Sequence, residues 1–424
     1  MTLLENEITT QNIERARNNT ELEQYNETEH KLTPLNPSVL IDQYRATALP
    51  VEQIYLSNPN DEFSLRVRRT QTTEGQDTYT ATLKTRGEIV NSALRRNEID
   101  TEISAKTFAF YAQQDLPRIT KYRADICDGV TVDFYNNPAE PVVVEVEHED
   151  SQVRAELLSF AQEVAGGLID RSNNPALTNE AIAHRLSGKE HLQPAETLDA
   201  FTHRVLGEML AHYSLGKKQV VVGLTGMSGS GKTTVARALQ TQITELFGEQ
   251  YTPTVLSTDD YHFGKTYLEK TYGAPYQDWD SEKTYNTAEL ARDLARHAEG
   301  TPLIKRHFDF DTEEPAYDTE LPLSPFIIIE GLYAGSRDLY EVRDAHFELP
   351  TNPATSIGRD IRRLLIDNRA NRAFPDAPSR LRYQIESALP LYQGLERPRA
   401  KAFSACSRPM AERAFMLARY TTTS

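Results

Sequence analysis

Hydrophobic and polar positions follow two different periods in the two halves of this chain. Between residues 27 and 150, apolar and polar side chains alternate as they do in half-buried β-strands. From residue 217 onward, short apolar runs at 220–222, 254–257 and 326–329 alternate with segments of helical spacing. The first pattern predicts a β-domain. The second predicts an α/β domain whose parallel strands are joined by crossover helices.

The pattern divides the chain into four segments. Residues 1–20 are polar and rich in Asn and Glu, so we expect a flexible arm. Residues 21–150 form the β-domain. Residues 151–215 show helical spacing and punctuation by Asn, Pro and Gly, which predicts a helical connector. Residues 216–424 form the α/β domain.

Composition excludes several classes of function. The net charge of −16 is unfavourable for general binding to nucleic acid, which needs a basic surface. No apolar run approaches the roughly 18 residues that span a membrane, and the N-terminus lacks a secretory signal, so we expect a cytoplasmic protein with no membrane partner. The two cysteines, Cys127 and Cys406, are too few for a disulfide framework or a thiolate metal site.

A glycine-rich loop between a strand and a helix is the strongest functional motif. Residues 226–233 have the sequence GMSGSGKT, follow the apolar run 220–222 and precede a segment of helical spacing. Glycine amides in this motif cradle phosphates, while Lys232 reaches the β- and γ-phosphate oxygens and the Thr233 hydroxyl meets Mg²⁺. The alternative is a Gly/Ser turn that ends in Lys-Thr by coincidence. We expect ATP or GTP to bind Gly226, Ser228, Gly229, Ser230, Gly231, Lys232, Thr233 and Thr234.

An aspartate at the end of the second apolar run is the candidate catalytic base. Asp259 follows residues 254–257, and the carboxyl ends of parallel strands form the ligand crevice of such sheets. A carboxylate there can orient an acceptor hydroxyl and take its proton as the oxygen attacks the γ-phosphate. The alternative is a turn or helix-capping aspartate.

Two further groups complete the expected phosphotransfer site. Glu330 ends the apolar run 326–329, where phosphate-loop enzymes hold Mg²⁺ or its waters. Arg362 and Arg363 belong to a late basic segment, and guanidinium groups there can close over the transferring phosphate as catalytic groups. The alternative is a solvated basic helix face. The same segment contains Arg359, Arg369 and Arg372.

Several motifs of the C-terminal half resemble, in order and spacing, the uridine-cytidine kinases and the related phosphoribulokinases. Beside the phosphate loop, they are residues 257–262 (STDDYH), 278–280 (DWD), 308–310 (FDF), 329–331 (IEG) and Arg362-Arg363. The resemblance implies that Asp259 is the base toward a nucleoside 5′-hydroxyl and that Asp280 holds the ribose hydroxyls. It also implies that Phe308 and Phe310 enclose the nucleobase. Family members carry a histidine shortly after the aromatic pair, where this chain has Glu313.

Charged residues occupy alternate positions in the N-terminal strands, a pattern that ordinary cores avoid. It occurs at Glu27/Glu29/Lys31, Arg66/Arg68, Glu98/Asp100, Lys121/Arg123 and Glu145/Glu147, and more weakly around Lys84 and Asp133. Period-two spacing places each set on one face of its strand. For a single strand, the usual explanation is a solvated sheet face. Because the pattern recurs with both signs, we expect a closed sheet around a charged channel for phosphates and divalent metal.

The order of these charged motifs resembles the CYTH, or triphosphate-tunnel, proteins. The likeness is carried by ExExK at residues 27–31, followed in order by RxR, K, ExD, KxR, D and ExE. Members of that family are antiparallel eight-stranded β-barrels that hydrolyse or cyclise triphosphates with Mg²⁺ or Mn²⁺. The resemblance implies phosphate binding by Lys31, Arg66, Arg68, Lys84, Lys121 and Arg123. It implies metal binding by Glu27, Glu29, Glu145 and Glu147.

The sequence thus predicts an ATP-dependent kinase that transfers the γ-phosphoryl group to a hydroxyl of a small molecule, with a nucleoside as the favoured acceptor. An inorganic or organic triphosphate occupies the N-terminal tunnel in this interpretation. Two alternatives stay open at this stage. Either the tunnel is a triphosphatase or pyrophosphatase and the kinase half regulates it, or the tunnel senses polyphosphate and gates the kinase.

Overall fold

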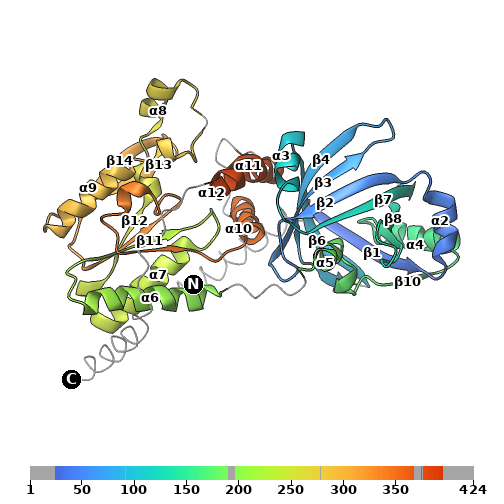
Figure 1. The fold of residues 1–424 in the computed structure, drawn as a ribbon, viewed down its shortest axis with the longest axis horizontal. Coiled ribbons are helices and arrows are strands. Elements are labelled where there is room, and N and C mark those ends of the chain that lie inside the picture. Colours follow the sequence, from blue (N-terminus) through green and yellow to red (C-terminus); the bar gives the residue numbers. More distant parts are fainter. Residues whose placement is uncertain are drawn as a thin grey trace, which may run out of the picture. The chain divides into compact units, whose positions relative to one another are not determined.

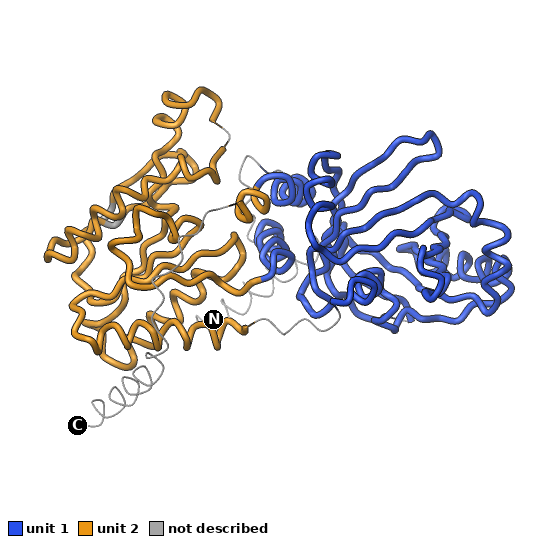
Figure 2. Tube along the Cα trace, in the orientation of Figure 1, with its two compact units in different colours: residues 1–193, 352–387 blue, residues 194–351, 388–424 orange. Residues whose placement is uncertain are grey.

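The computed structural model describes residues 24–90, 92–189, 196–276, 278–366, 374 and 376–394. The chain divides into two compact units, shown in Figure 2: unit 1 comprises residues 1–193 and 352–387, and unit 2 comprises residues 194–351 and 388–424. The expected arm, residues 1–20, lies outside the described residues. The chain therefore leaves unit 2 after residue 351 and returns to it at residue 388.

Unit 1 is built on a closed antiparallel barrel (Figure 1). Its wall has the strand order β1-β9-β8-β7-β2-β3-β4-β6, and pairing of β6 with β1 closes the ring. β10 extends the sheet beside β1, and β5 lies beside β6. The strands are β1 Asn26–Pro34, β2 Leu49–Tyr55, β3 Phe63–Gln71, β4 Asp77–Thr85, β5 Glu88–Val90, β6 Ala93–Glu102, β7 Arg118–Cys127, β8 Val130–Tyr135, β9 Val143–Glu147 and β10 Leu168–Asp170. The antiparallel barrel expected for this half is confirmed.

Alternation of side chains places a hydrophobic core of unit 1 outside the barrel wall. Val144 and Val146 of β9 are buried in a cluster with alanines of α4 (Ser151–Ala165), whereas Glu145 between them lines the lumen. α4 begins after Asp150, whose carboxylate accepts hydrogen bonds from two backbone N–H groups of the first turn. Because the apolar faces are buried against helices, the inner face is free to carry charge.

Unit 1 contains further helices, and one approaches the barrel wall closely. They are α2 Pro37–Tyr44, α3 Ala105–Ala112, η1 Pro175–Leu177, α5 Asn179–Leu186, α10 Pro353–Ile366, α11 Ala377–Tyr383 and the π-helix η6 Gln384–Ala388. Gly358 lets α10 lie directly against Phe63 of β3, since a Cβ atom would overlap the ring. The described residues between 352 and 387 thus belong to unit 1, whereas the sequence pattern assigned this segment to the domain 216–424. An amphipathic pattern predicts that a helix buries one face, but it does not name the partner.

Unit 2 is an α/β layer structure with a parallel sheet of order β12-β15-β11-β16. The sheet strands are β11 Val220–Thr225, β12 Thr254–Ser257, β15 Phe326–Glu330 and β16 Ala345–Glu348, and β13 Leu303–Asp309 and β14 Glu314–Leu321 form a separate antiparallel hairpin. The helices are α6 Leu198–Ser214, α7 Lys232–Phe247, η2 Glu249–Tyr251, η3 Thr258–Tyr261, α8 Lys265–Tyr272, η4 Glu282–Thr284, α9 Thr287–Ala298, η5 Arg337–Leu339 and α12 Leu389–Gly394.

Helices cover both faces of this parallel sheet (Figure 1). Val220 and Val222 of β11 are buried in a cluster with α6 and α7, and Val221 faces the opposite cluster, which contains Leu290 and Leu294 of α9. Strands buried on both sides explain the continuous apolar run at 220–222. The α/β fold expected for this half is confirmed.

The expected helical connector, residues 151–215, is divided between the units. α4, β10 and α5 belong to unit 1, and α6 belongs to unit 2. Residues 190–195 lie outside the described residues. None of the described helices has the length and hydrophobicity that a membrane-spanning helix requires.

We expect Gly358→Ala to destabilise unit 1 by about 1–3 kcal/mol, because the new methyl group displaces the buried Phe63 ring. Thermal unfolding followed by circular dichroism measures the change. Gly394→Ala is the control, since Gly394 ends α12 and a Cβ atom there would meet no other atom within 4 Å among the described residues. Equal melting temperatures for Gly358→Ala and the wild type would contradict the close packing of α10 on β3.

Candidate functional site

The loop between β11 and α7 has the backbone geometry of a phosphate-binding turn. Gly229 and Gly231 have φ angles of 78° and 100°, in the left-handed region that favours glycine. Gly226 has no room for a side chain, because a Cβ atom would lie 2.5 Å from Ser230 Oγ. Gly231 is the N-cap of α7, and no side chain of the described residues caps the helix. The first N–H groups of α7 can therefore bind an anion.

Lys232 and Thr233 open α7 and contact two different sets of oxygens. Lys232 Nζ donates hydrogen bonds to the carbonyl oxygens of Gly226 (2.8 Å) and Met227 (3.0 Å). Thr233 Oγ1 donates to Glu330 Oε1 at 3.4 Å. The structure therefore brings together the hydroxyl and the carboxylate that the sequence predicted as Mg²⁺ ligands. Both are hard oxygen donors of the kind that Mg²⁺ prefers.

Asp259 follows β12 and interacts by charge with the same group of residues. Burial raises the pKa of Asp259 from 3.8 to about 6, with contributions from the neighbouring Glu330 and Asp280, while Lys232 opposes the rise. β12, β15 and β11 are adjacent parallel strands, so their carboxyl ends meet at one edge of the sheet. One electrostatic cluster thus contains four residues that the sequence predicted from separate motifs: Lys232, Asp259, Asp280 and Glu330.

The chain leads from Asp259 into an aromatic cluster. The centroid of the His262 ring lies 4.7 Å from that of Phe308 and 6.1 Å from that of Trp279. Phe308 is buried, whereas Phe310 is 65% exposed, and their ring centroids are 5.1 Å apart. The two phenylalanines predicted to enclose an acceptor are therefore neighbours, but only the first is part of the packed cluster.

His262 is a residue of this cluster to which the sequence analysis assigned no role. It is 8% exposed, and neither ring nitrogen has a hydrogen-bond partner among the described residues. Burial lowers the pKa of His262 to about 4, so the ring is neutral at pH 7. A neutral imidazole offers one donor and one acceptor. The signal was its position three residues after Asp259 within the motif STDDYH.

The predicted arginine segment lies in unit 1. Arg359 Nε of α10 donates a hydrogen bond to Glu62 Oε2 at 2.9 Å, and Arg362 lies 3.8 Å from the same carboxylate. Arg362 and Arg363 are exposed. Their role toward a transferring phosphate stays a prediction. Two further arginines of this segment, Arg369 and Arg372, lie outside the described residues.

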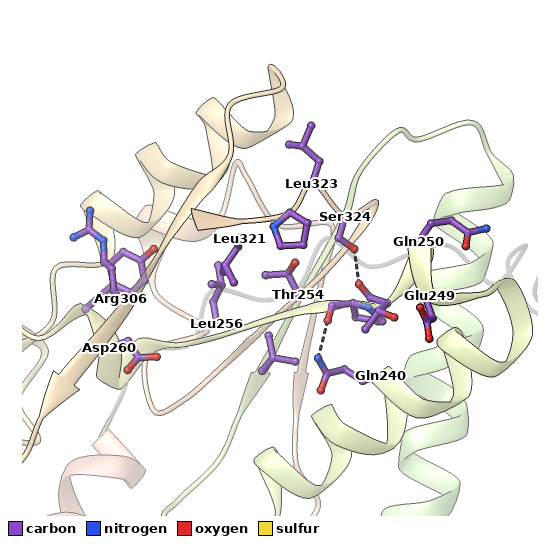
Figure 3. A pocket seen from close by; sticks show the side chains of 15 residues that line it. Gln240, Glu249, Gln250, Thr254, Leu256, Asp260, Arg306, Leu321, Leu323 and Ser324 are labelled. Carbon is purple, nitrogen blue, oxygen red and sulfur yellow. Dashed lines mark hydrogen bonds between the residues drawn. The ribbon is translucent and has the colours of Figure 1, made fainter. Parts of the chain in front are cut away.

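A groove of about 530 Å³ lies along the free edge of β12 (Figure 3). Its lining is largely apolar and includes Leu256, Leu321 and Leu323. Gln240 and Ser324 each donate a hydrogen bond to a backbone carbonyl oxygen just before β12. The groove contains none of the site residues predicted from the sequence, so we assign it no catalytic role.

The lumen of the barrel is a charged cavity of about 770 Å³. Its lining unites side chains from β1, β3, β4, β7 and β9, as the alternating charge pattern requires. The predicted residues that line it are Glu27, Glu29, Lys31, Arg66, Arg68, Lys84, Arg123, Glu145 and Glu147. Period-two spacing was therefore sufficient to find most of this site.

Ion pairs hold many of these charges in place. Lys31 Nζ lies 2.5 Å from Glu145 Oε1, and Lys84 Nζ lies 2.9 Å from Glu27 Oε1. Arg96, which the sequence analysis did not assign, bridges Glu27 (2.7 Å) and Glu29 (2.6 Å). It could have been found from the sequence, because residue 96 continues the alternation of residues 98 and 100 by one step.

Cations crowd around Arg68 in one part of the lumen, although Arg66 lies near Glu98 and Arg123 pairs with Glu145. Burial and the neighbouring Arg66 and Arg123 lower the pKa of Arg68 to about 10. Like charges that crowd in this way bind an anion favourably, because the anion relieves their repulsion. This part of the lumen therefore fits phosphate oxygens.

Lys121, predicted to bind phosphate, is not among the residues that line the cavity. Its ammonium group is fully buried and pairs with Asp133 at 2.5 Å, with Asn179 Oδ1 at 3.3 Å. Burial and Arg123 lower the pKa of Lys121 to about 7, and Asp133 opposes this shift. We therefore assign Lys121 a structural role, since it holds the buried Asp133 that also pairs with Arg123.

The carboxylates predicted to bind metal in the lumen form a second charged region. Burial raises the pKa of Glu147 to about 7, and Glu27, Glu98 and Glu29 contribute to the rise. Among the described residues, however, no group of three or more Asp, Glu, His or Cys side chains is already arranged to hold a metal ion. The ion pairs with Arg96 and Lys84 occupy carboxylates that a metal would need.

Residues 221–346 match the model of the phosphoribulokinase and uridine kinase family. A uridine kinase from Leuconostoc citreum (strain KM20) is 31% identical over 121 residues, which cover 28% of this chain and 55% of that kinase. This chain therefore spans about half the length of that relative. The residues that match the family model all lie in unit 2.

Solved structures show partial likenesses at low identity. A possible uridine kinase from Bacillus stearothermophilus is 20% identical, with a TM-score of 0.29, and covers 44% of this chain and 94% of its own. The inorganic triphosphatase NE1496 is 21% identical, with a TM-score of 0.22, and covers 40% of this chain and 97% of its own.

We expect Asp259→Asn to stabilise the protein at pH 8 by on the order of 1 kcal/mol. The pKa of Asp259 in the folded state, about 6, exceeds its usual value of 3.8. The folded state therefore loses stability as pH rises from about 3.8 to about 6, and above pH 6 the full cost of the charged carboxylate is present. The gain should disappear near pH 4. Urea unfolding at both pH values measures it.

Asp260→Asn is the matched control, because it removes the adjacent charge and its amide oxygen can still accept the hydrogen bond from Phe308 N. Equal stabilities of Asp259→Asn and the wild type at pH 8 would contradict the cost of burying the Asp259 carboxylate beside Glu330.

Proposed function

We propose that unit 2 is an ATP-dependent kinase that transfers the γ-phosphoryl group to a hydroxyl of a small molecule, with a nucleoside as the acceptor. The observation that carries the proposal is the position of Asp259, a carboxylate with a pKa of about 6 that interacts with both Lys232 and Glu330. A carboxylate of this pKa is ionised at pH 7 and retains a high proton affinity. Both properties suit a general base.

The residues of the phosphate loop have separable roles in this reaction. The N-terminal amides of α7 bind phosphate oxygens, and Lys232 exchanges its carbonyl contacts for the β- and γ-phosphates. Thr233 and Glu330 would hold Mg²⁺, which neutralises charge on the phosphate oxygens when bound. The residues present therefore fit both ATP and the metal.

Asp259 accepts the proton of the acceptor hydroxyl as the reaction proceeds. The acceptor oxygen forms a bond to the γ-phosphorus, and the bond from that phosphorus to the β–γ bridging oxygen breaks. The products are a phosphate monoester and a nucleoside diphosphate. The proton stays on Asp259 until it is released to solvent.

The aromatic cluster favours a planar acceptor. Trp279 offers a partly exposed apolar ring that packs against the buried Phe308, and the neutral His262 ring has one donor and one acceptor nitrogen. Asp280 follows Trp279 in the chain and interacts by charge with Asp259. A nucleoside combines a flat heterocycle with ribose hydroxyls, which is the chemistry that these groups bind.

Asp259→Asn should reduce kcat by about 10²–10⁴-fold, because the acceptor loses its base, and should change the affinity for ATP little. Turnover is measured with labelled ATP and a panel of nucleosides and other small alcohols, and each labelled product is identified. Asp260→Asn is the control and should retain most activity. Full turnover of Asp259→Asn would exclude its role as the base, and no product with any acceptor would refute the kinase.

For the barrel, we propose binding of an inorganic or organic triphosphate as a second function. The crowding of Arg66 and Arg123 around Arg68 favours it, together with a cavity large enough for three phosphate groups. Hydrolysis there would need a metal, Mg²⁺ or Mn²⁺, and the described carboxylates would first have to leave their ion pairs. We therefore assign the lumen binding and derive no hydrolytic step.

Arg68→Gln should weaken binding of inorganic triphosphate by about tenfold or more, because a charged partner of the anion is lost. It should not lower stability, since repulsion among the arginines is relieved. Isothermal calorimetry with and without Mg²⁺ measures the affinity. Arg69→Gln is the matched control, because Arg69 is the next residue of β3 and pairs with Asp77 on the outer surface. Equal losses of affinity in both variants would contradict binding in the lumen.

A further inference from the structure

Arg96 of β6 lies directly opposite Glu27 of β1 in the barrel wall. The register pairs Glu27 with Arg96 and Glu29 with Leu94. Because side chains alternate between the two faces of a strand, residues 27, 29 and 96 share the face that lines the lumen. Opposite and diagonal positions of a strand pair are close enough for long side chains to touch. The register therefore places the guanidinium group of Arg96 within reach of two carboxylates.

The guanidinium group of Arg96 binds both carboxylates through separate nitrogen atoms. Arg96 Nε donates a hydrogen bond to Glu27 Oε2 at 2.7 Å, and Arg96 Nη2 donates to Glu29 Oε1 at 2.6 Å. The Arg96 side chain is 12% exposed, and those of Glu27 and Glu29 are 6% and 3% exposed. Charge-assisted bonds of this length are strong and geometrically specific when they are removed from water. Arg96 is therefore held in one position between the two carboxylates.

Two lysines bind the same carboxylates. Lys84 Nζ donates hydrogen bonds to both oxygens of Glu27, at 2.9 and 3.0 Å. Lys31 Nζ lies 3.6 Å from Glu29 Oε1, although its shorter contact is to Glu145. Both oxygens of Glu27 are thus engaged by cations of the chain. Of these three cations, Arg96 is the one that joins Glu27 to Glu29.

A divalent metal in this part of the lumen would need the same oxygen atoms. Mg²⁺ and Mn²⁺ bind oxygen ligands, and their affinity for a protein site depends on the number of charged ligands that it offers. The sequence analysis assigned Glu27 and Glu29 to such a site. The position between them is filled by a guanidinium group, which does not lose its proton in proteins. The carboxylates of β1 therefore do not fit a metal while Arg96 is in place.

The neighbouring Arg95 shows that the strand face decides this role. Arg95 precedes Arg96 in β6, pairs in register with Thr28 and is exposed. A step of one residue turns a side chain to the other face of its strand. Arg95 accordingly is not among the residues that line the lumen. The two arginines carry the same charge, and only Arg96 neutralises the carboxylates of β1.

We propose that Arg96 is a built-in counter-cation that excludes divalent metal from the empty barrel lumen, because it neutralises the two carboxylates to which the metal would bind. The proposal goes beyond the triphosphate binding proposed for the barrel and does not rest on it. Its physical content is competition between two cations. A cation that belongs to the chain acts at a high effective concentration, whereas a dissolved ion must displace it. The affinity for metal therefore depends on residue 96.

Titration of the full chain with Mn²⁺ alone measures this competition, with the unbound ion followed by electron paramagnetic resonance. ATP and triphosphate are left out, so no metal arrives with a phosphate ligand. In Arg96→Gln the carboxylates lose their bridging cation, and the Kd for Mn²⁺ should fall by about tenfold or more. Arg95→Gln is the matched control, because it removes the same charge from the outer face of the same strand. Its Kd should equal that of the wild type.

A double variant locates the site that Arg96→Gln creates. Glu27→Gln combined with Arg96→Gln replaces a charged ligand by a neutral amide, so the gained affinity for Mn²⁺ should be lost. Retention of the gained affinity in the double variant would place the metal elsewhere and overturn the proposal. A wild-type site with a micromolar Kd that Glu27→Gln abolishes would overturn it as well, since Arg96 would then not exclude the metal.

Arg96→Lys keeps the test decisive if Arg96→Gln does not fold. Lysine retains the positive charge in the lumen, but a single ammonium group lacks the two-armed geometry of the guanidinium group. Mn²⁺ should therefore bind more tightly than in the wild type and more weakly than in Arg96→Gln. Circular dichroism shows which variants are folded. An unchanged affinity for Mn²⁺ in every folded variant of Arg96 would refute its role.

The Mn²⁺ titration and the calorimetry on Arg68→Gln have independent outcomes. If calorimetry finds no binding of inorganic triphosphate, the second function proposed for the barrel fails, and the Mn²⁺ titration still decides the role of Arg96. If triphosphate binds and Arg96→Gln leaves the affinity for Mn²⁺ unchanged, the role of Arg96 is refuted and triphosphate binding stands.

Discussion

Pairing of charges that are removed from water is the constraint on which both units depend. An unpaired buried ion costs several kcal/mol, and a close partner of opposite sign recovers much of this cost. In the barrel lumen Arg96 bridges Glu27 and Glu29, and in unit 2 Lys232 offsets the charge of Asp259. The balance is incomplete at two places, around Arg68 and around Asp259. A ligand gains most where such an excess of one sign exists.

The two units reach this state through different scaffolds. The barrel uses alternation along antiparallel strands, which turns Glu145 into the lumen and its neighbours Val144 and Val146 outward. The parallel sheet instead buries both faces of its strands and presents charge only where the strands end, as at Glu330. Charged groups therefore line a wall in one unit and gather at an edge in the other.

Much of the candidate site could be predicted from the sequence because local motifs specify it. The strand–loop–helix order placed Lys232 and Thr233, and the ends of apolar runs placed Asp259 and Glu330. His262 and Glu62 could not be assigned in this way. The roles of these two residues come from segments far away in the chain. His262 is buried without a hydrogen-bond partner among the described residues, and Glu62 pairs with Arg359 of α10. No periodicity of their own surroundings reports such contacts.

The sequence by itself determined the barrel, the parallel sheet and the face of each strand that carries charge, because these depend on periods of two and 3.6 residues. Only the tertiary structure decided that α10 and α11 pack on the barrel and that Lys121 is buried against Asp133 instead of lining the cavity. The physical reason is the same in both cases. A local pattern states that a face must be buried or a charge paired, and the partner is chosen by long-range packing in three dimensions.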